Sequence, residues 1–169
     1  MAFSDLALGA YSKLQAAPFL RPMIRPLPDE SATIALGQRL AALARPGDVL
    51  ALHGDLAAGK TTLARAFIRA LTRPDEEVPS PTFTLVQTYD TAVAPIWHFD
   101  LYRLSGPDEV FELGFDEALS GGILLIEWPE RLGALLPAER LDVTLEGSGP
   151  RYARITGHGS WVDRIREFE

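Results

Sequence analysis

The sequence of 169 residues contains no cysteine, which excludes both a disulfide framework and a thiolate metal site. It also has no uninterrupted apolar run that approaches the roughly 20 residues needed to span a membrane. No clear combination of basic start, compact apolar stretch and small-residue cleavage site opens the chain. Lys and Arg number 16 against 23 Asp and Glu, and the formal net charge of −7 argues against direct gripping of nucleic-acid phosphates. These absences predict an acidic, soluble, cytoplasmic protein without membrane contact.

With 47% hydrophobic residues, the chain is long enough to form one domain with a proper core. Residues 1–28 differ from the rest, because they are apolar without sustained periodicity and hold several prolines near their end. We interpret residues 1–28 as a weakly ordered N-terminal extension; a short helix that docks on the domain or on a partner is the alternative. Residues 29–169 are predicted to fold as one domain, without internal repeats or an interdomain linker.

A phosphate-binding loop is the strongest motif in the chain. Gly54, Gly59, Lys60 and Thr61, within H-G-D-L-A-A-G-K-T-T, match G-x-x-x-x-G-K-[ST]. The two glycines permit a backbone geometry in which amide N–H groups face phosphate oxygens. The lysine of this motif reaches the β- and γ-phosphates of a nucleotide, and the hydroxyl that follows it can bind Mg²⁺. The motif therefore predicts a nucleotide site that uses Mg²⁺.

The flanking sequence gives this loop the setting that the motif requires. Residues 48–53 form a short apolar run, which predicts a buried strand, and residues 60–71 have the apolar face of a helix. The other expected strands are 82–89, 95–100, 122–127, 141–146 and 151–156, and the other expected helices begin near Asp29, Pro107 and Ser160. This alternation predicts an α/β fold, a three-layer P-loop NTPase domain with a central, mostly parallel sheet and a C-terminal antiparallel hairpin.

Two acidic residues end expected strands and are candidates for work on the phosphates. Glu127 ends I-L-L-I-E, where parallel strands deliver side chains to a ligand crevice, and it is the candidate metal-associated carboxylate. Asp100 ends W-H-F-D and could orient or activate an attacking water. A surface carboxylate after a strand is the alternative for each. We interpret His98 as a structural or rim histidine, and Trp128 as either a core aromatic or a lid.

Four short segments follow the phosphate loop along the chain. They are S-P-T-F-T-L-V (80–86), H-F-D-L-Y-R-L (98–104), E-L-G-F-D-E (112–117) and I-E-W-P-E-R-L (126–132). In this order and combination they resemble the TsaE (YjeE-type) P-loop ATPases of bacteria, from about Asp29 to the end of the chain. The combination is far more specific than the phosphate loop alone.

The resemblance implies an accessory ATPase in the formation of N6-threonylcarbamoyladenosine, the tRNA modification beside the anticodon. In that family the ATPase works with two proteins, TsaB and TsaD, of which TsaD transfers the threonylcarbamoyl group. ATP and Mg²⁺ are the implied cofactors, and slow, partner-stimulated hydrolysis is expected. Because this chain is acidic, we expect it to meet tRNA only through the complex. The expected docking elements are the S-P-T-F segment, Tyr102 and Arg103, and the acidic helix with Glu109 and Glu112.

The resemblance also implies roles for individual residues. The implied catalytic residues are Lys60, Asp100 and Glu127, and the implied metal ligands are Thr61 and Glu127. Thr33 lies where the family holds the adenine, and Thr82 is expected to sense the γ-phosphate. The complete expected nucleotide-binding set is Thr33, Gly54, Asp55, Leu56, Ala57, Ala58, Gly59, Lys60, Thr61, Thr62 and Thr82.

One position of the loop departs from the family pattern. The loop usually reads G-x-L-G-A-G-K-T, so Ala57 replaces a glycine in this chain. If the backbone there is left-handed, the alanine costs about 1 kcal/mol.

Two further function classes stay open on the residues alone. A small-molecule kinase built on the same loop would carry an arginine-rich lid, whereas the late arginines of this chain are scattered among acidic residues. A non-catalytic, nucleotide-dependent binding module would need only two states biased by the γ-phosphate. A GTPase is disfavoured, because no N-K-x-D base-reading motif occurs.

Overall fold

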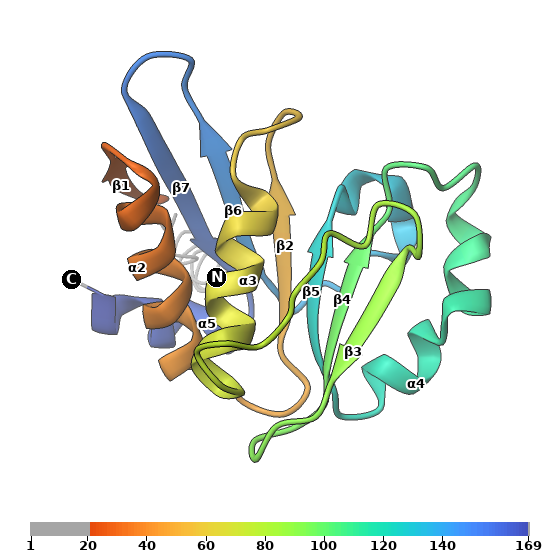
Figure 1. Cartoon of the computed structure of the whole chain (residues 1–169). Helices are drawn as coiled ribbons and strands as arrows, with labels where there is room; N and C mark the ends of the chain where they lie inside the picture. Colours follow the sequence, from red (N-terminus) through yellow and green to blue (C-terminus); the bar gives the residue numbers. More distant parts are fainter. Residues whose placement is uncertain (1–20, 169) are drawn as a thin grey trace, which may run out of the picture.

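A computed structural model of the chain describes residues 21–168. Seven strands form a single sheet in the order β1-β7-β6-β2-β5-β4-β3, with helices on both of its faces (Figure 1). The strands are β1 (Met23–Leu27), β2 (Val49–His53), β3 (Val86–Tyr89), β4 (Ile96–Asp100), β5 (Ile123–Glu127), β6 (Leu141–Glu146) and β7 (Arg151–Gly157). The α-helices are α2 (Glu30–Ala42), α3 (Lys60–Leu71), α4 (Phe115–Leu119) and α5 (Trp161–Arg164), and the 3₁₀ helices are η1 (Pro107–Leu113), η2 (Pro129–Leu135) and η3 (Ile165–Phe168).

The middle of the sheet is parallel and its edges are antiparallel. β2 pairs in parallel with both β5 and β6, and β5 pairs in parallel with β4. β6 and β7 form the predicted closing hairpin, while β1 and β3 add antiparallel edges. Because the parallel strands run in one direction, β2, β4 and β5 all end at the same edge of the sheet. Asp100 and Glu127, the last residues of β4 and β5, lie directly opposite each other in this register.

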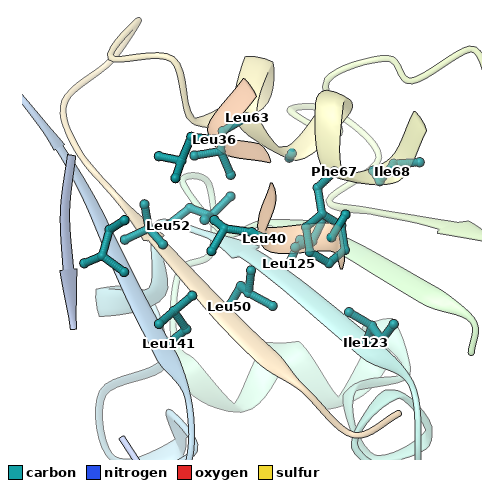
Figure 2. Close-up of a cluster of buried hydrophobic side chains, with 14 of the residues drawn as sticks. Leu36, Leu40, Leu50, Leu52, Leu63, Phe67, Ile68, Ile123, Leu125 and Leu141 are labelled. Carbon is teal, nitrogen blue, oxygen red and sulfur yellow. The ribbon is translucent and has the colours of Figure 1, made fainter. Parts of the chain in front are cut away.

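Two hydrophobic cores, one on each face of the sheet, give the domain its three layers. Helix α2 begins where Asp29 accepts a hydrogen bond from the backbone N–H of Ala32, and it packs with α3 over the first face. Figure 2 shows this core, with Leu40 and Phe67 from the helices above Leu50 and Leu125 from the strands. The second core lies under η1, α4 and η2 on the opposite face. The predicted α/β class and its layers are therefore confirmed.

The beginning of the folded domain differs from the prediction. Met23–Leu27 form the edge strand β1, which pairs with β7, so the domain begins before Asp29. Residues 21 and 22 precede this strand, and residues 1–20, the larger part of the predicted extension, lie outside the described residues. The strand is short and contains Pro26, which suits an edge position, because proline has no backbone N–H to donate to a neighbouring strand.

The strand predicted over 82–89 starts only at Val86. The residues before it form a turn in which the N–H of Leu85 donates to the carbonyl oxygen of Pro81 at 2.7 Å. Leu85 itself has a left-handed backbone, with a φ of 66°. The alternation T-F-T-L therefore belongs to a turn, and this turn carries Thr82 towards the end of β4.

The helices predicted near Pro107 and Ser160 are short and largely of the 3₁₀ type. The seven-residue η1 follows Gly106, and α5 continues directly into η3 at the end of the described chain. In the described part of the chain, none of the helices has the length and apolar character required to cross a bilayer.

Candidate functional site

The loop between β2 and α3 has the strained backbone that the phosphate-binding motif requires. Gly54 and Gly59 have φ values of 138° and 108°, which disfavour any residue with a side chain. A Cβ atom on Gly54 would also lie 2.8 Å from the carbonyl oxygen of Leu145. Ala57 has a φ of 63°. The backbone of Ala57 is therefore left-handed, and the alanine costs about 1 kcal/mol relative to glycine in this conformation.

Lys60, the first residue of α3, is only 4% exposed. Its Nζ atom donates hydrogen bonds to the carbonyl oxygens of Gly54 at 2.5 Å and Asp55 at 2.8 Å. The same atom lies 4.1 Å from the centre of the Trp128 ring. Burial lowers the pKa of Lys60, and the nearby carboxylates, Glu127 foremost, oppose this shift. The amine is thus held at the mouth of the loop by neutral groups.

Glu127 ends β5 and is only 2% exposed. The hydroxyl of Thr61 donates to its carboxylate, at 3.0 Å from Oε1 and 3.1 Å from Oε2. The Nε2 atom of His98 lies 2.8 Å from Oε1. The two residues predicted as metal ligands therefore contact each other across the space between α3 and β5.

Asp100 lies beside Glu127 at the end of β4 and is 5% exposed. Its Oδ1 atom accepts a hydrogen bond from the N–H of Tyr102 at 3.0 Å, and its Oδ2 atom accepts a long one from Thr82 at 3.4 Å. Burial raises the pKa of Asp100, and the neighbouring Glu127 carboxylate raises it further. A carboxyl group with a raised pKa and few donors is a better proton acceptor than a surface aspartate.

These groups line one cleft of about 530 Å³ at the carboxyl edge of the sheet. The predicted site residues on its wall are Leu56, Ala57, Ala58, Gly59, Lys60, Thr61, Thr62, Thr82, Asp100 and Glu127. Gly54 and Asp55 do not line it; their carbonyl oxygens accept hydrogen bonds from Lys60 instead. Ser80, Tyr102, Arg103 and Trp128 complete the wall.

Thr33 lies in a second cleft, of about 330 Å³, on the other side of the loop. Ala57, Gly59 and Thr62 line both clefts, so the phosphate loop is their common wall. The tip of the β6–β7 hairpin reaches the second cleft through Gly149 and Arg151. A single ligand could therefore extend across the phosphate loop and place one part in each cleft.

Two residues outside the predicted site set contact its members: His98 and Trp128. His98, for which a structural and a rim position stayed open, is fully buried, so it is not at the rim, and it contacts Glu127. Trp128, for which core and lid stayed open, is half-buried, has a φ of 58° and lies over Lys60. The motif I-E-W signals the second of these, because the residue after a buried strand enters the crevice. The position of His98, two residues before Asp100 on the same strand, signals the first.

Protein groups alone offer few metal ligands here. Among residues 21–168, no three or more His, Cys, Asp or Glu side chains form a group that could hold a metal ion. A hard cation such as Mg²⁺ commonly takes one or two protein ligands and completes its shell with phosphate oxygens and water. Thr61 and Glu127 fit that role, because both carry oxygen atoms at the head of α3.

The parallel sheet, the glycine-bearing loop that opens α3 and the buried lysine define an α/β protein of the P-loop class. A family model described as "Threonylcarbamoyl adenosine biosynthesis protein TsaE" matches residues 27–155. Similar proteins include "tRNA threonylcarbamoyladenosine biosynthesis protein TsaE" of Rickettsia felis, 45% identical over 120 residues that cover 71% of this chain and 70% of that protein. The protein of the same name from Bacillus subtilis is 43% identical over 127 residues, covering 73% of this chain and 77% of its own.

A solved structure gives the same result. "Crystal structure of Bacillus subtilus YdiB" matches with a TM-score of 0.68 and 32% identity, over 87% of this chain and 93% of that chain. The chain belongs to the TsaE family of tRNA threonylcarbamoyladenosine biosynthesis. The resemblance drawn from the five sequence motifs is therefore confirmed.

Proposed function

We propose that the protein is a Mg²⁺-dependent ATPase that supports threonylcarbamoyladenosine formation on tRNA together with TsaB and TsaD. One observation carries this proposal: three ionisable groups converge at one edge of the sheet, and each is oriented by hydrogen bonds. Lys60 donates to backbone carbonyls, Glu127 accepts from Thr61 and contacts His98, and Asp100 accepts from a backbone N–H and Thr82. Among the described residues, no ion pair joins Lys60 to a carboxylate. The charges remain free to act on a ligand.

The proposed substrate is ATP. The ammonium of Lys60 and the N-terminal end of the twelve-residue helix α3 present positive charge to the β- and γ-phosphates. Lys60 can exchange its two carbonyl partners for phosphate oxygens, which form stronger, charge-assisted hydrogen bonds. The adenine would lie in the cleft that holds Thr33, because that cleft shares the loop as a wall. The choice of adenine over guanine rests on the family.

Thr61 and Glu127 would hold Mg²⁺, directly or through water. When bound, the ion would supply positive charge that offsets the negative charge developing on the transferred phosphoryl group. The oxygens of Thr61 and Glu127 already converge within 3.1 Å, on a carboxylate that is almost fully buried. This pairing of a loop hydroxyl with a strand-end carboxylate is the donor set that a phosphate-bound Mg²⁺ requires.

Asp100 is the proposed group for the chemical step. In hydrolysis a water oxygen attacks the γ-phosphorus, the bond to the β–γ bridging oxygen breaks, and a proton leaves the water. Asp100 orients that water and accepts its proton, a role that its raised pKa supports. Thr82 contacts Asp100 from the turn at 82–85, so this turn is the proposed segment that responds to the γ-phosphate.

The proposed docking surface for TsaB and TsaD surrounds the first cleft. Phe83 is 80% exposed and Leu56 is 68% exposed, and the guanidinium of Arg103 lies 4.3 Å from the centre of the Phe83 ring. Large apolar side chains with this exposure, next to a ligand cleft, are typical of protein contacts. Glu109 and Glu112 on η1 are also exposed and extend the surface with negative charge.

Transfer RNA would be met only through the complex. The formal net charge of the chain is −7. Proteins that bind nucleic acid directly use Lys and Arg side chains to neutralise several backbone phosphates. The exposed surface around the cleft combines the apolar Phe83 and Leu56 with acidic residues and the arginine Arg103, a mixture that suits a protein partner.

The experiment that tests this function measures ATP turnover by the chain alone, with small-molecule acceptors, and with TsaB and TsaD. We expect slow hydrolysis alone, stimulation by the two proteins, and no phosphorylation of acceptors. Capture of TsaB and TsaD should be stronger with a non-hydrolysable ATP analogue than without nucleotide. Phe83→Ser should weaken capture, whereas Leu119→Ser, at a 42% exposed residue on α4, should not. Tight tRNA binding by the isolated chain, without partner capture under any nucleotide condition, would contradict the proposal.

A further inference from the structure

His98 lies beneath the candidate site, in contact with Glu127 on its wall. Side chains alternate between the two faces of β4, so His98 and Asp100 point to the same face as α3, while Phe99 belongs to the opposite core. Glu127 faces that side too, because Ile126 belongs to the opposite core. His98 therefore lies one step deeper in the sheet than Asp100, beneath the Glu127 carboxylate.

The contact between the two residues is short and fully buried. The Nε2 atom of His98 lies 2.8 Å from Oε1 of Glu127, and the exposed fraction of the histidine is zero. The Nε2 atom is therefore placed to donate a hydrogen bond to the carboxylate oxygen, which accepts it. The other ring nitrogen, Nδ1, is buried and has no hydrogen-bond partner among the described residues. Packing alone would be served by an apolar side chain, which would leave no polar atom without a partner.

We propose that His98 is a positioning residue that fixes the Glu127 carboxylate for Mg²⁺ in the nucleotide complex. This inference rests on the proposed function, because it assigns His98 to the metal-associated side of that site. Second-layer hydrogen bonds of this kind orient ligating carboxylates, and their loss typically reduces metal affinity about 10- to 100-fold.

Thr61 cannot supply the same constraint. Its hydroxyl also donates to Glu127, yet this hydroxyl is itself the proposed partner of the metal. Once the Thr61 oxygen engages the metal, its hydrogen bond to the carboxylate is no longer independent of the ion. His98 is then the one donor from β4 that holds Oε1 whether or not a cation is bound.

The test compares three substitutions at one position. His98→Leu removes the donor, His98→Gln retains an amide N–H at the length of Nε2, and His98→Asn retains the amide but is one carbon too short. The measurement is the Mg²⁺ concentration that half-saturates binding of a non-hydrolysable ATP analogue, followed by calorimetry. We expect this concentration to rise about 10-fold or more in the Leu and Asn variants and to stay near the wild-type value in the Gln variant. Analogue binding in EDTA should be the same in all four proteins.

Leu125→Ala is the matched control, because Leu125 pairs with His98 in the β4–β5 register and is equally buried. It should lower the melting temperature without changing the Mg²⁺ dependence. If the Leu variant does not fold, the comparison of Gln with Asn carries the test. Equal Mg²⁺ dependence in the Gln, Asn and wild-type proteins would overturn the proposal.

A second readout needs neither nucleotide nor metal. The ¹⁵N chemical shifts of the His98 ring in the wild-type protein report which nitrogen carries the proton, and we expect the Nε2–H form. A ring protonated on Nδ1 alone would contradict the proposal. Failure of the wild type to bind any ATP analogue would instead contradict the proposed function, and this ring measurement would still stand.

Discussion

The two ends of the parallel strands bury charge in opposite ways. At the amino end of β2, Asp48 forms a two-pronged ion pair with Arg164, with Nη1–Oδ1 and Nη2–Oδ2 distances of 2.7 and 2.6 Å. The N–H of Arg45 adds a third donor to the same carboxylate at 2.7 Å. At the carboxyl end, Lys60 and Glu127 are buried as deeply but are not paired with each other; carbonyl oxygens, a hydroxyl and an imidazole hold them. At the amino end opposite charges pair with each other, whereas at the carboxyl end Lys60 and Glu127 do not, which fits the proposed role of the carboxyl end in binding a ligand.

Backbone strain follows the same division. Three non-glycine residues in the described chain have a positive φ: Ala57, Leu85 and Trp128. Ala57 and Trp128 line the first cleft, and Leu85 ends the turn that carries Thr82 to Asp100. Each such residue costs on the order of 1 kcal/mol or more, and such strain persists where a site requires it. The amino end of β2 has a glycine, Gly47, at its one positive φ.

The largest expected effect is the loss of stability when the Asp48–Arg164 pair at the amino end of the parallel strands is broken. Arg164→Met leaves Asp48 buried without its partner, which should cost about 3–5 kcal/mol of unfolding free energy. Urea unfolding at neutral pH measures this loss. The double variant Asp48→Leu/Arg164→Met should recover much of it, since no uncompensated charge remains. A single variant within 1 kcal/mol of the wild type would show that the pair does not stabilise the fold.

The next largest effect is a loss of ATP affinity at the carboxyl end of the parallel strands, here called the open end, without a loss of stability. Lys60→Ala removes the charge that we assign to the β- and γ-phosphates, so ATP affinity should fall roughly 100-fold or more, equivalent to about 2.7 kcal/mol. The burial that lowers the pKa of Lys60 means that its charged form is costly in the fold. The melting temperature of the variant should therefore match or exceed that of the wild type.

Arg69→Ala provides the control for the lysine variant. Arg69 is also a cation on α3, and it donates to the carbonyl oxygen of Glu76 outside the cleft. Its removal should leave ATP affinity within about twofold of the wild type, because distant surface charges are screened at physiological salt. Wild-type affinity in a folded Lys60→Ala variant would refute the site assignment.

A smaller difference separates the two carboxylates of the open end. Asp100→Asn should lower kcat about 100-fold, the loss of a proton acceptor, while analogue affinity changes little. Glu127→Gln should weaken Mg²⁺-dependent binding about 10-fold and turnover with it, because a metal-associated group acts before and during the reaction. Analogue calorimetry and steady-state kinetics measure the two effects. Equal loss of binding and turnover in both variants would remove the division of roles.

The local parts of the carboxyl end could be predicted from the sequence. The phosphate loop, its flanking strand and α3 at Lys60–Leu71 appear as predicted, because glycine geometry and helical periodicity act over a few residues. Asp100 and Glu127 lie at strand ends, as their places after apolar runs indicated. The roles of the predicted site residues stay predictions.

The remainder depends on contacts between distant parts of the chain. Asp48 and Arg164 are 116 positions apart, and no local pattern marks either as a partner. The contact of His98 with Glu127 requires the β4–β5 register, which single-strand periodicity does not give. The alternation at 82–85 favoured a strand, although tertiary contacts made it a turn in which the carbonyl oxygen of Leu85 accepts a hydrogen bond from the N–H of Asp100 at 2.9 Å.

The smallest expected effect sharpens the account of strain at the open end. Ala57→Gly should raise the unfolding free energy by about 0.5 kcal/mol, because glycine removes the left-handed penalty of about 1 kcal/mol but adds unfolded-state entropy. Ala58→Gly is the matched control: Ala58 is the next residue of the loop and is not among the residues with a positive φ. This control should lose stability by a similar amount, since only the entropy cost applies. Urea unfolding of the two variants should therefore give changes of opposite sign. Changes of the same sign would mean that the backbone of Ala57 carries no strain, and ATP affinity should differ little from the wild type in either case.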